Sequence, residues 1–232
     1  MDLSRRNQLV VYTAIAGRGR DDLVDPVPAP GVDYVCFTDQ PLTSKIWDIR
    51  PFAWTHLTQA VRTAKHPKVL PHEYFPDHSM SIWIDANIAP SPDIGKVAEF
   101  YLSRYDLALH RHPRRDCLYK EAEVVSEVQK DFPSTIDRII SRYSQNGMPH
   151  DFGLWECGIL FRRHLSPDIV TAMELWWREI DAGSQSDQIH WAYVVWKLGL
   201  KFRTIDGNLR ESPFFRYKPH PAIYWGAMGE AS

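Results

Sequence analysis

Two oxygen-bearing side chains, Asp85 and Asn87, directly follow the short apolar run SIWI at residues 81–84. A short run rich in β-branched residues predicts a buried strand. Residues two apart in an extended chain point to the same side, so both side chains can reach one ligand beyond the strand end. A carboxylate and an amide oxygen suit a hard divalent cation that itself holds phosphates. The alternative is structural: Asp85 caps a turn and Asn87 adopts a left-handed turn conformation.

The rest of the chain alternates between expected strands and expected helices. Strands are expected at residues 9–15, 33–37, 47–51, 80–84, 107–109, 157–161 and 202–205. Helices are expected at residues 57–69 (broken at Pro67), 91–103, 118–129, 134–145, 167–180 and 186–198. This alternation predicts one α/β domain over residues 1–232, with a doubly wound, mostly parallel sheet flanked by helices. We place its core at residues 6–211 and a C-terminal tail at 212–232.

Composition excludes several functional classes. Hydrophobic residues make up 44% and charged residues 24% of the 232 residues, with a net charge of −2, so no general attraction to nucleic acid or an anionic membrane is expected. The three cysteines, Cys36, Cys117 and Cys157, lack C-x-x-C spacing, which argues against a disulfide framework and a zinc centre. The polar N-terminus is followed by neither a signal peptide nor a transmembrane segment, so a cytoplasmic location is expected.

Six ordered sequence blocks between about residue 9 and about residue 215 resemble a known family. They are VVYTAIAG, VDYVCFTD, KVLPHEYFPDHSMSIWIDANI, ALHRHPRRDCLYKEAE, LWECGILFRRH and SDQIHWAYVVWKLGLK. The chain resembles the glycosyltransferase-like family whose plant members are linked to turgor regulation and seed mucilage polysaccharide. That family is similar to nucleotide-sugar transferases of the GT-A fold. The resemblance therefore implies a single GT-A-like domain.

The resemblance also implies a metal site. In GT-A enzymes an Asp-x-Asp signature holds a divalent metal, which bridges the diphosphate of the donor. Asp85 and Asn87 occupy the place of that signature, but the neutral Asn87 supplies less charge to the cation than an Asp would. The alternative for Asn87 is a contact with the ribose of the donor. Lys218 and His220 echo C-terminal elements of retaining family-8-type transferases, in which a His completes the metal shell and a Lys meets the diphosphate. The resemblance thus implies Mn²⁺ or Mg²⁺ at Asp85, Asn87 and His220; the alternative for 217–221 is a tail without a fixed structure.

Donor-binding residues are implied at the ends of the first two strands. In GT-A enzymes the end of the first strand touches the base and ribose, which here points to Tyr12, Thr13, Ala14 and Gly17. Asp39, after the second strand, can accept a hydrogen bond from uracil or a ribose hydroxyl. The alternatives are an ordinary strand-to-loop turn and an Asx turn.

Basic residues elsewhere also face the donor in this interpretation. Arg62 and Lys65 are three apart and share a helix face, where they can offset diphosphate charge. His110 and His112 lie in a polar stretch directly after a strand, and we expect a loop that faces a sugar. The alternatives are a solvated basic helix face and an exposed basic loop.

Three residues are candidates for catalysis. Glu156 precedes a strand in a region that faces the acceptor in GT-A folds, where a carboxylate can act as a general base. Asp187 and Gln188 begin a helix, and in retaining GT-A enzymes an Asp-Gln pair at a helix start faces the transferred sugar. The structural alternatives are a turn cap at Glu156 and a favourable interaction of Asp187 with the helix dipole.

The resemblance, together with these residues, implies a glycosyltransferase that moves a hexose from a nucleotide diphosphate sugar, a UDP-sugar, to a carbohydrate or glycoconjugate acceptor with Mn²⁺ or Mg²⁺. Two other classes stay open. One is a metal-dependent hydrolase of an amide or phosphoester, with Asp85, His110, His112 and His220 around a metal-activated water. The other is a catalytically silent nucleotide- or carbohydrate-binding module, which the neutral Asn87 keeps open.

Overall fold

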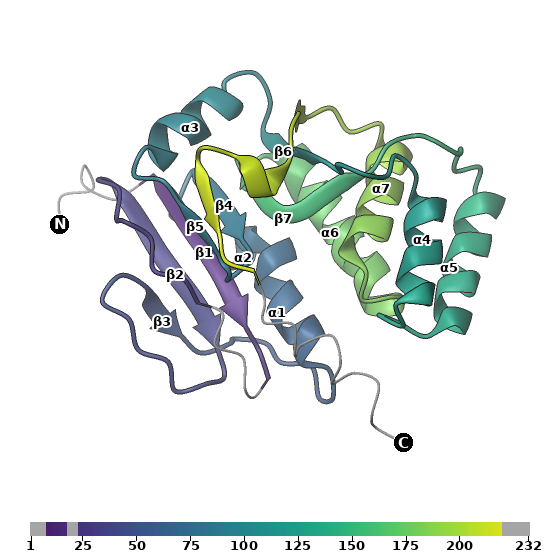
Figure 1. The fold of residues 1–232 in the computed structure, drawn as a ribbon, viewed down its shortest axis with the longest axis horizontal. Helices are drawn as coiled ribbons and strands as arrows, with labels where there is room; N and C mark the ends of the chain where they lie inside the picture. Colours follow the sequence, from purple (N-terminus) through teal and green to yellow (C-terminus); the bar gives the residue numbers. More distant parts are fainter. Residues whose placement is uncertain (1–7, 18–22, 220–232) are drawn as a thin grey trace.

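A seven-stranded sheet forms the centre of the protein in the computed structural model, which describes residues 8–17 and 23–219 (Figure 1). Its strand order is β3-β2-β1-β4-β7-β6-β8. The strands are β1 Leu9–Ile15, β2 Val32–Thr38, β3 Asp48–Arg50, β4 Met80–Ile84, β6 Leu107–Arg111, β7 Trp155–Arg162 and β8 Arg203–Ile205. All neighbours are parallel except β7, which runs antiparallel to both β4 and β6. The predicted mostly parallel α/β fold is confirmed.

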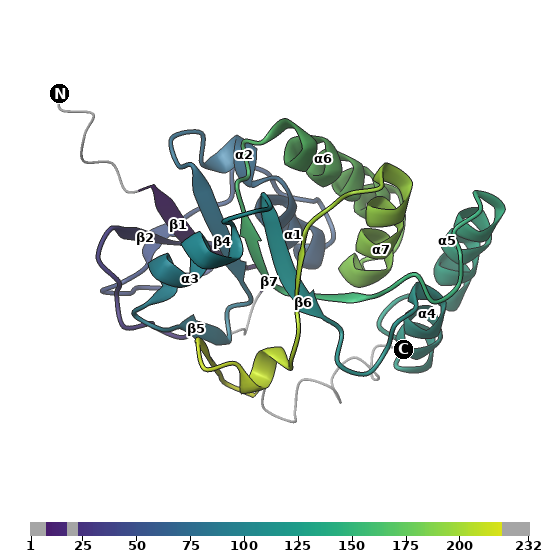
Figure 2. The same ribbon diagram turned by 90° about the horizontal axis from the view of Figure 1, so that it is seen from above.

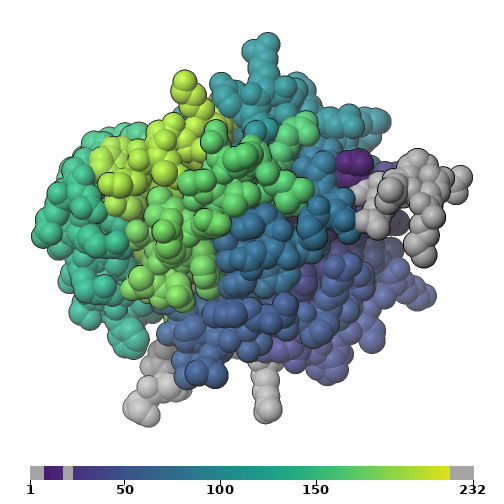
Figure 3. Space-filling model, turned by 180° about the vertical axis from the view of Figure 1, so that it is seen from behind, coloured from purple at the N-terminus to yellow at the C-terminus, as the bar shows by residue number. Residues whose placement is uncertain are grey.

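Helices cover the two faces of this sheet unequally. They are α1 Ala60–Val69, α2 Pro71–Tyr74, α3 Ile94–Tyr101, α4 Leu118–Glu127, α5 Pro133–Gln145, α6 Pro167–Ala182 and α7 Asp187–Leu198, with a 3₁₀ turn at Leu209–Glu211. Buried residues of α1 and α4 to α7 form one core cluster, and those of α3 form the other (Figure 2). From behind, the blue segment of α1 and α2 lies against the green segment of α6 (Figure 3).

The alternation of side chains along β1 explains why the sheet needs cover on both sides. Val10 and Tyr12 belong to the first core cluster, whereas Leu9 and Val11 belong to the second, and all four are buried. A strand buried on both faces is a continuous apolar run rather than an alternating one. This is why the strand was visible in the sequence.

The C-terminal segment differs from the expectation. A second, two-stranded sheet pairs β5 (Ile88–Pro90) with β9 (Phe215–Tyr217), and neither strand was expected. Phe215 is buried, with its ring 6.0 Å from that of Phe161. Residues 212–219 therefore pack onto the domain, and the core boundary placed at residue 211 was too early.

Two further differences concern helix α1 and its surroundings. The helix runs through Pro67 and ends at Val69, whereas a break at Pro67 was expected. Pro71 then begins α2 as its first residue, a position where the missing N–H costs nothing.

Across residues 8–17 and 23–219, no helix has the length and apolarity required to cross a lipid bilayer.

Candidate active site

Two clefts meet beyond the carboxyl end of β4. The first, of about 250 Å³, lies between the end of β1, helix α1 and the end of β4. The second, of about 470 Å³, is bounded by β7, α4 and the segment 209–217. The residues that line both are Lys68, Asp85, Asn87, Lys130 and Asp187. This shared wall is the candidate active site, because a group bound in one cleft meets a group bound in the other there.

A cluster of opposite charges forms the centre of the wall. Oδ2 of Asp187, at the start of α7, lies 2.6 Å from Nζ of Lys68 and 3.0 Å from Nζ of Lys65. Nζ of Lys68 is also 3.6 Å from Oδ1 of Asp85. The side chain of Asp85 is 47% exposed, whereas that of Lys68 is 6% exposed. Lys68 therefore joins a buried carboxylate to one that faces the clefts.

The charges in this cluster hold Asp187 ionised. Burial alone would raise the pKa of Asp187, but the ammonium groups of Lys65 and Lys68 hold it well below its usual range. Burial lowers the pKa of Lys65, which has one carboxylate partner. Burial also acts to lower the pKa of Lys68, but Asp187 and Asp85 outweigh it and raise that pKa. The cluster thus presents a fixed anion and a fixed cation side by side.

Asp85 is supported from its own strand and from the strand beside it. Its Oδ1 accepts a 3.0 Å hydrogen bond from Nε1 of Trp83. Its backbone N–H donates to the carbonyl of Gly158 on β7 at 2.9 Å. The half-exposed Asp85 carboxylate fits a divalent cation that is shared with a ligand's phosphates. Within the described ranges no group of three His, Cys, Asp or Glu side chains converges on such an ion.

Asn87 has a structural role that was not expected. Its side-chain amide donates a 2.9 Å hydrogen bond to the carbonyl of Lys218, and its own carbonyl accepts from the N–H of Lys218 at 2.8 Å. Asn87 therefore fastens β5 to the end of β9 through its side-chain N–H and its backbone, and its expected place beside Asp85 in a metal shell stays a prediction. The Lys218 side chain is exposed and lines neither cleft. His220 lies outside the described residues.

The expected donor-binding residues of β1 divide into two groups. Ala14 lines the first cleft. Tyr12 and Thr13 are fully buried, and the Tyr12 hydroxyl donates to the carbonyl of Lys68 at 3.2 Å, so neither side chain reaches a ligand. Neither side chain faces a cleft, because the strand is covered on both faces, which leaves only the backbone of these two residues for the expected donor contacts.

Gly17 and Asp39 bind each other. The N–H of Gly17 donates to both carboxylate oxygens of Asp39 at 3.1 Å, and Gly17 has a φ of 89°, which favours glycine. Neither residue lines the two clefts. Asp39 thus closes the loop after β1 through a long-range bond rather than through the Asx turn that was the structural alternative.

Of the expected basic pair on α1, Lys65 lines the first cleft and Arg62 does not. The guanidinium of Arg62 donates to the carbonyls of Ile180 and, at 2.6 Å, Gly183, at the end of α6. These contacts hold the guanidinium against the C-terminal end of α6 and away from the first cleft, which corrects the diphosphate role expected for Arg62. Lys68, one turn after Lys65, was visible by the same three-residue spacing but was not selected.

The two expected histidines also separate. His110 is buried in β6 and lines neither cleft, so its expected sugar contact was wrong. His112 lines the second cleft, where its Nδ1 accepts the N–H groups of Arg114 at 3.2 Å and Arg115 at 2.9 Å. Burial, together with Arg115 and Arg114, lowers the pKa of His112 to about 4. The neutral ring shapes the loop, and the described residues do not assemble the hydrolase set of Asp85 with His110 and His112.

The second cleft contains the carboxyl group of Glu156, which has only one of its two oxygens in a hydrogen bond within the described residues. Oε1 of Glu156 accepts from Nη1 of Arg210 at 3.2 Å, while Oε2 is buried without a hydrogen-bond partner among the described residues. Burial, only partly countered by Arg210, raises the pKa of Glu156. Gln188 lines the same cleft directly after Asp187. All three residues expected to act in catalysis therefore lie in one cleft.

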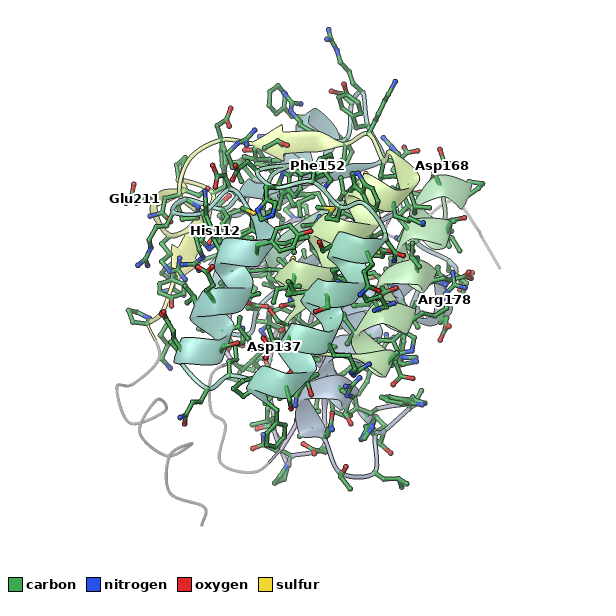
Figure 4. The ribbon with its side chains drawn as sticks, turned by 90° about the vertical axis from the view of Figure 1, so that its right-hand side faces the viewer. His112, Asp137, Phe152, Asp168, Arg178 and Glu211 are labelled. Atoms are coloured by element: carbon green, nitrogen blue, oxygen red, sulfur yellow. The ribbon has the colours of Figure 1, made fainter. Side chains whose placement is uncertain are left out.

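Several residues of the second cleft were not selected from the sequence: Arg114, Arg115, Glu121, Arg210 and Tyr217. In Figure 4, His112 and Glu211 lie on the same side of the molecule, where the loop after β6 approaches the 3₁₀ turn. The Arg210 guanidinium stands 5.2 Å from the ring centre of Tyr217 on β9. No motif marks this contact, because it depends on the pairing of β9 with β5.

The fold and site define an α/β protein with its ligand clefts at the carboxyl edge of a mostly parallel sheet. The chain belongs to the TOD1/MUCI70, glycosyltransferase-like domain family, whose model matches residues 37–210. This confirms the family indicated by the sequence blocks.

One curated relative and two solved structures illustrate the similarity. The chain is 28% identical over 151 residues to the probable hexosyltransferase MUCI70 of Arabidopsis thaliana; the match covers 60% of this chain and 26%, about a quarter, of that protein. Mouse xyloside xylosyltransferase 1 in its apo form superposes with a TM-score of 0.48 and 12% identity, over 86% of this chain and 84% of that one. The apo WbbM bifunctional glycosyltransferase gives 0.48 and 10%, over 87% and 38%.

Proposed function

We propose that this chain is a GT-A-type glycosyltransferase that moves a hexose from a UDP-sugar to a carbohydrate or glycoconjugate acceptor. The observation that carries the proposal is the position of Asp187, an ionised carboxylate that lines both clefts. Membership of a glycosyltransferase-like family and similarity to a probable hexosyltransferase support the choice of reaction. In this proposal the donor occupies the first cleft and the acceptor occupies the second.

The first cleft has the chemistry that a nucleotide diphosphate requires. Ala14 and Val61 line an apolar part, and Lys65, Lys68 and Lys130 contribute ammonium groups. Fixed cations that face a diphosphate stabilise the negative charge that develops as it leaves. A divalent cation held by Asp85 would add neutralisation of the same leaving group.

In the transfer, the bond between the anomeric carbon and the β-phosphate oxygen breaks, and its electron pair stays on the diphosphate. An acceptor hydroxyl oxygen forms the new bond and gives up its proton to a base. Glu156 lines the acceptor cleft and has one oxygen without a hydrogen-bond partner among the described residues, so it is the candidate base, and its raised pKa makes it a stronger base once ionised. The Asp187 carboxylate stabilises positive charge that develops on the sugar.

The test is binding and turnover of UDP-sugars with and without Mn²⁺. We expect a set of UDP-sugars to raise the melting temperature, because a ligand that binds only the folded state stabilises it. At least one should release UDP with an acceptor or with water. In Asp85→Ala the Mn²⁺-dependent part of the shift should disappear, whereas Asp48→Ala, an exposed carboxylate on edge strand β3, should keep it.

Two results would count against the proposal. Failure of every UDP-sugar to change the melting temperature of the wild-type protein would remove the donor site. Binding without UDP release over a broad acceptor panel would identify a silent nucleotide-binding module instead.

A further inference from the structure

Arg162, at the end of β7, is a completely buried cation without a carboxylate partner among the described residues. Its guanidinium donates to the carbonyl of Lys68 at 2.8 Å and to the hydroxyl of Tyr12, and it touches the sulfur of Met173 at 3.3 Å. Removing a charge from water without an opposite charge is expensive. An apolar side chain would fill the same space without this desolvation cost, so the hydrogen bonds of Arg162 are the reason to look for a role.

The contacts of Arg162 converge on one backbone carbonyl. The Tyr12 hydroxyl also donates to the carbonyl of Lys68, at 3.2 Å. Lys68 lies in the last turn of α1, where carbonyls have no partner within the helix and a cation is favoured by the helix dipole. Two fully buried side chains from two different strands, β1 and β7, therefore hold the end of α1 from inside the core.

The side chain of Lys68 extends from this fixed point to the shared wall of the clefts. Its ammonium group is 2.6 Å from Asp187 and 3.6 Å from Asp85, and it stands 5.2 Å from the ring centre of Trp83. We infer that Arg162 is a positioning residue, which with Tyr12 fixes the last turn of α1 so that the ammonium group of Lys68 stays between Asp187 and Asp85. The expected effect of Arg162 on turnover rests on the proposed function, whereas its effect on the position of Lys68 does not.

The inference makes a selective claim about the two neighbouring lysines. Lys65 shares the Asp187 carboxylate at 3.0 Å, but Arg162 and Tyr12 contact the carbonyl of Lys68. Loss of the support should therefore release Lys68 and leave Lys65 bound. General loosening of the fold would expose both lysines together.

Acetylation of lysines by an acyl ester, read by mass spectrometry, measures this directly in the complete protein. Lys96, whose side chain is 85% exposed, is the internal reference. In Arg162→Met, and independently in Tyr12→Phe, we expect Lys68 to react roughly tenfold faster than in the wild type, the effect of losing about one hydrogen bond's net stabilisation. The rate at Lys65 should stay within about twofold in both.

Tyr143→Phe is the matched control. Tyr143 is also fully buried, and its hydroxyl is hydrogen-bonded to Glu179 at 2.8 Å, so the same hydroxyl is lost at the same depth without contact to Lys68. In this variant the acetylation rates of Lys65 and Lys68 should be those of the wild type. Unchanged protection of Lys68 in Tyr12→Phe, or equal acceleration at Lys65 and Lys68, would overturn the inference. Because Tyr12→Phe removes one oxygen atom only, the test does not depend on the folding of Arg162→Met.

Turnover supplies a second measurement on the same variants. With the UDP-sugar that the wild type hydrolyses or transfers, kcat should fall roughly tenfold in Tyr12→Phe, with little change in UDP affinity. Tyr143→Phe should have the kcat of the wild type. An unchanged kcat together with a released Lys68 would overturn the link to turnover. If the wild type binds no UDP-sugar, the proposed function fails, and the acetylation pattern still decides the positioning role.

Discussion

Nζ of Lys68 and Oδ2 of Asp187 are 2.6 Å apart, although 119 residues of sequence separate them. Lys68 lies in the last turn of α1 and Asp187 begins α7, so the pair joins two helices at the carboxyl edge of the sheet. Both side chains are nearly enclosed, at 6% and 10% exposure. A buried ion pair is costly to break from one side only, because the remaining charge keeps no partner.

Asp187→Asn should therefore affect both turnover and stability. We expect turnover to fall roughly a hundredfold, about 3 kcal/mol, with little change in donor affinity, because a positioned charge acts mainly in the transition state. Lys65 and Lys68 lose their shared carboxylate, so the free energy of unfolding should fall by about 3 kcal/mol or more. Turnover, UDP binding and urea denaturation of the same variant measure all three.

Asp168→Asn is the control for a purely helical role. Asp168 lies in the first turn of α6, as Asp187 does in α7, but it is exposed. Its replacement should cost a few tenths to about 1 kcal/mol and leave turnover unchanged. If Asp187→Asn behaves in the same way, Asp187 has no part in the site and Glu156 remains as the candidate base.

Asn87→Asp tests the fastening of β5 to β9. The substitution removes the N–H donor to the Lys218 carbonyl and places a carboxylate against that oxygen. We expect a loss of about 1–3 kcal/mol in the free energy of unfolding, measured by urea denaturation. Because the side chain faces the backbone of Lys218, Mn²⁺-dependent UDP binding should not tighten, contrary to what restoration of an Asp-x-Asp signature would suggest.

Asn146→Asp is the matched change at an exposed position. The Asn146 amide donates to the hydroxyl of Tyr193 at 2.9 Å, and a hydroxyl can reverse its role and donate to a carboxylate. This variant should be within about 0.5 kcal/mol of the wild type. Tighter metal binding and full stability in Asn87→Asp would support the expected place of Asn87 in the metal shell.

The strands that carry the site could be predicted because their signal is local. β1, β2 and β4 are short apolar runs, and burial on both faces of the sheet requires such runs. β5 and β9 have three residues each, and they contain Pro90 and Arg216, so no periodic pattern marks them. Their pairing joins residues about 130 apart, which no window of sequence can show.

The site was predictable only where a residue's neighbours follow from its own element. Asp85 comes after a strand and Asp187 begins a helix, and both positions lie at the carboxyl edge. The spacing of residues 62, 65 and 68 marks one helix face but not which side chains reach the clefts. Arg62 is drawn to the carbonyls at the end of α6, a contact across 118 residues. Whether each of these side chains reaches a cleft therefore depends on partners that are distant in the sequence.

Gly158→Ala should weaken the ligand site without unfolding the protein. A Cβ atom at residue 158 would lie 3.1 Å from Oδ2 of Asp85 and 3.1 Å from Cδ2 of Leu209, closer than ordinary contact. The Asp85 carboxylate must then move by a few tenths of an ångström. We expect Mn²⁺-dependent UDP affinity to fall roughly tenfold, about 1.4 kcal/mol, in a calorimetric titration.

Gly95→Ala makes the same chemical change in open space. Beyond its own chain neighbours and the backbone of its own helix, no atom of the described residues lies within 4 Å of a Cβ at residue 95 in α3. This variant should gain up to about 1 kcal/mol in stability, because alanine favours a helix, and should bind UDP as the wild type does. Equal affinities in the two variants would remove Gly158 from the description of the site.

Buried histidines give the protein a predictable response to acid. Burial, as the main cause, lowers the pKa of four of them to about 4: His66, His112, His164 and His190. Their unfolded pKa is about 6.5. Between pH 6.5 and pH 4 the unfolded chain therefore binds more protons at these groups than the folded chain does. Their contribution to stability is present above pH 6.5 and is lost as the pH falls through this window.

The free energy of unfolding should therefore decrease from pH 7 to pH 4.5, by up to about 1.4 kcal/mol per pH unit for each histidine. Glu121 and Glu156, whose pKa values burial raises, act in the opposite direction, whereas His72 and His110, whose pKa values burial lowers, act in the same direction as the four. Urea denaturation at pH 7, 5.5 and 4.5 measures the slope. In His164→Gln one of these groups is gone, and the slope should become shallower by up to about 1.4 kcal/mol per pH unit. A stability that is constant from pH 7 to 4.5 in the wild type would show that these imidazoles are protonated in the folded protein.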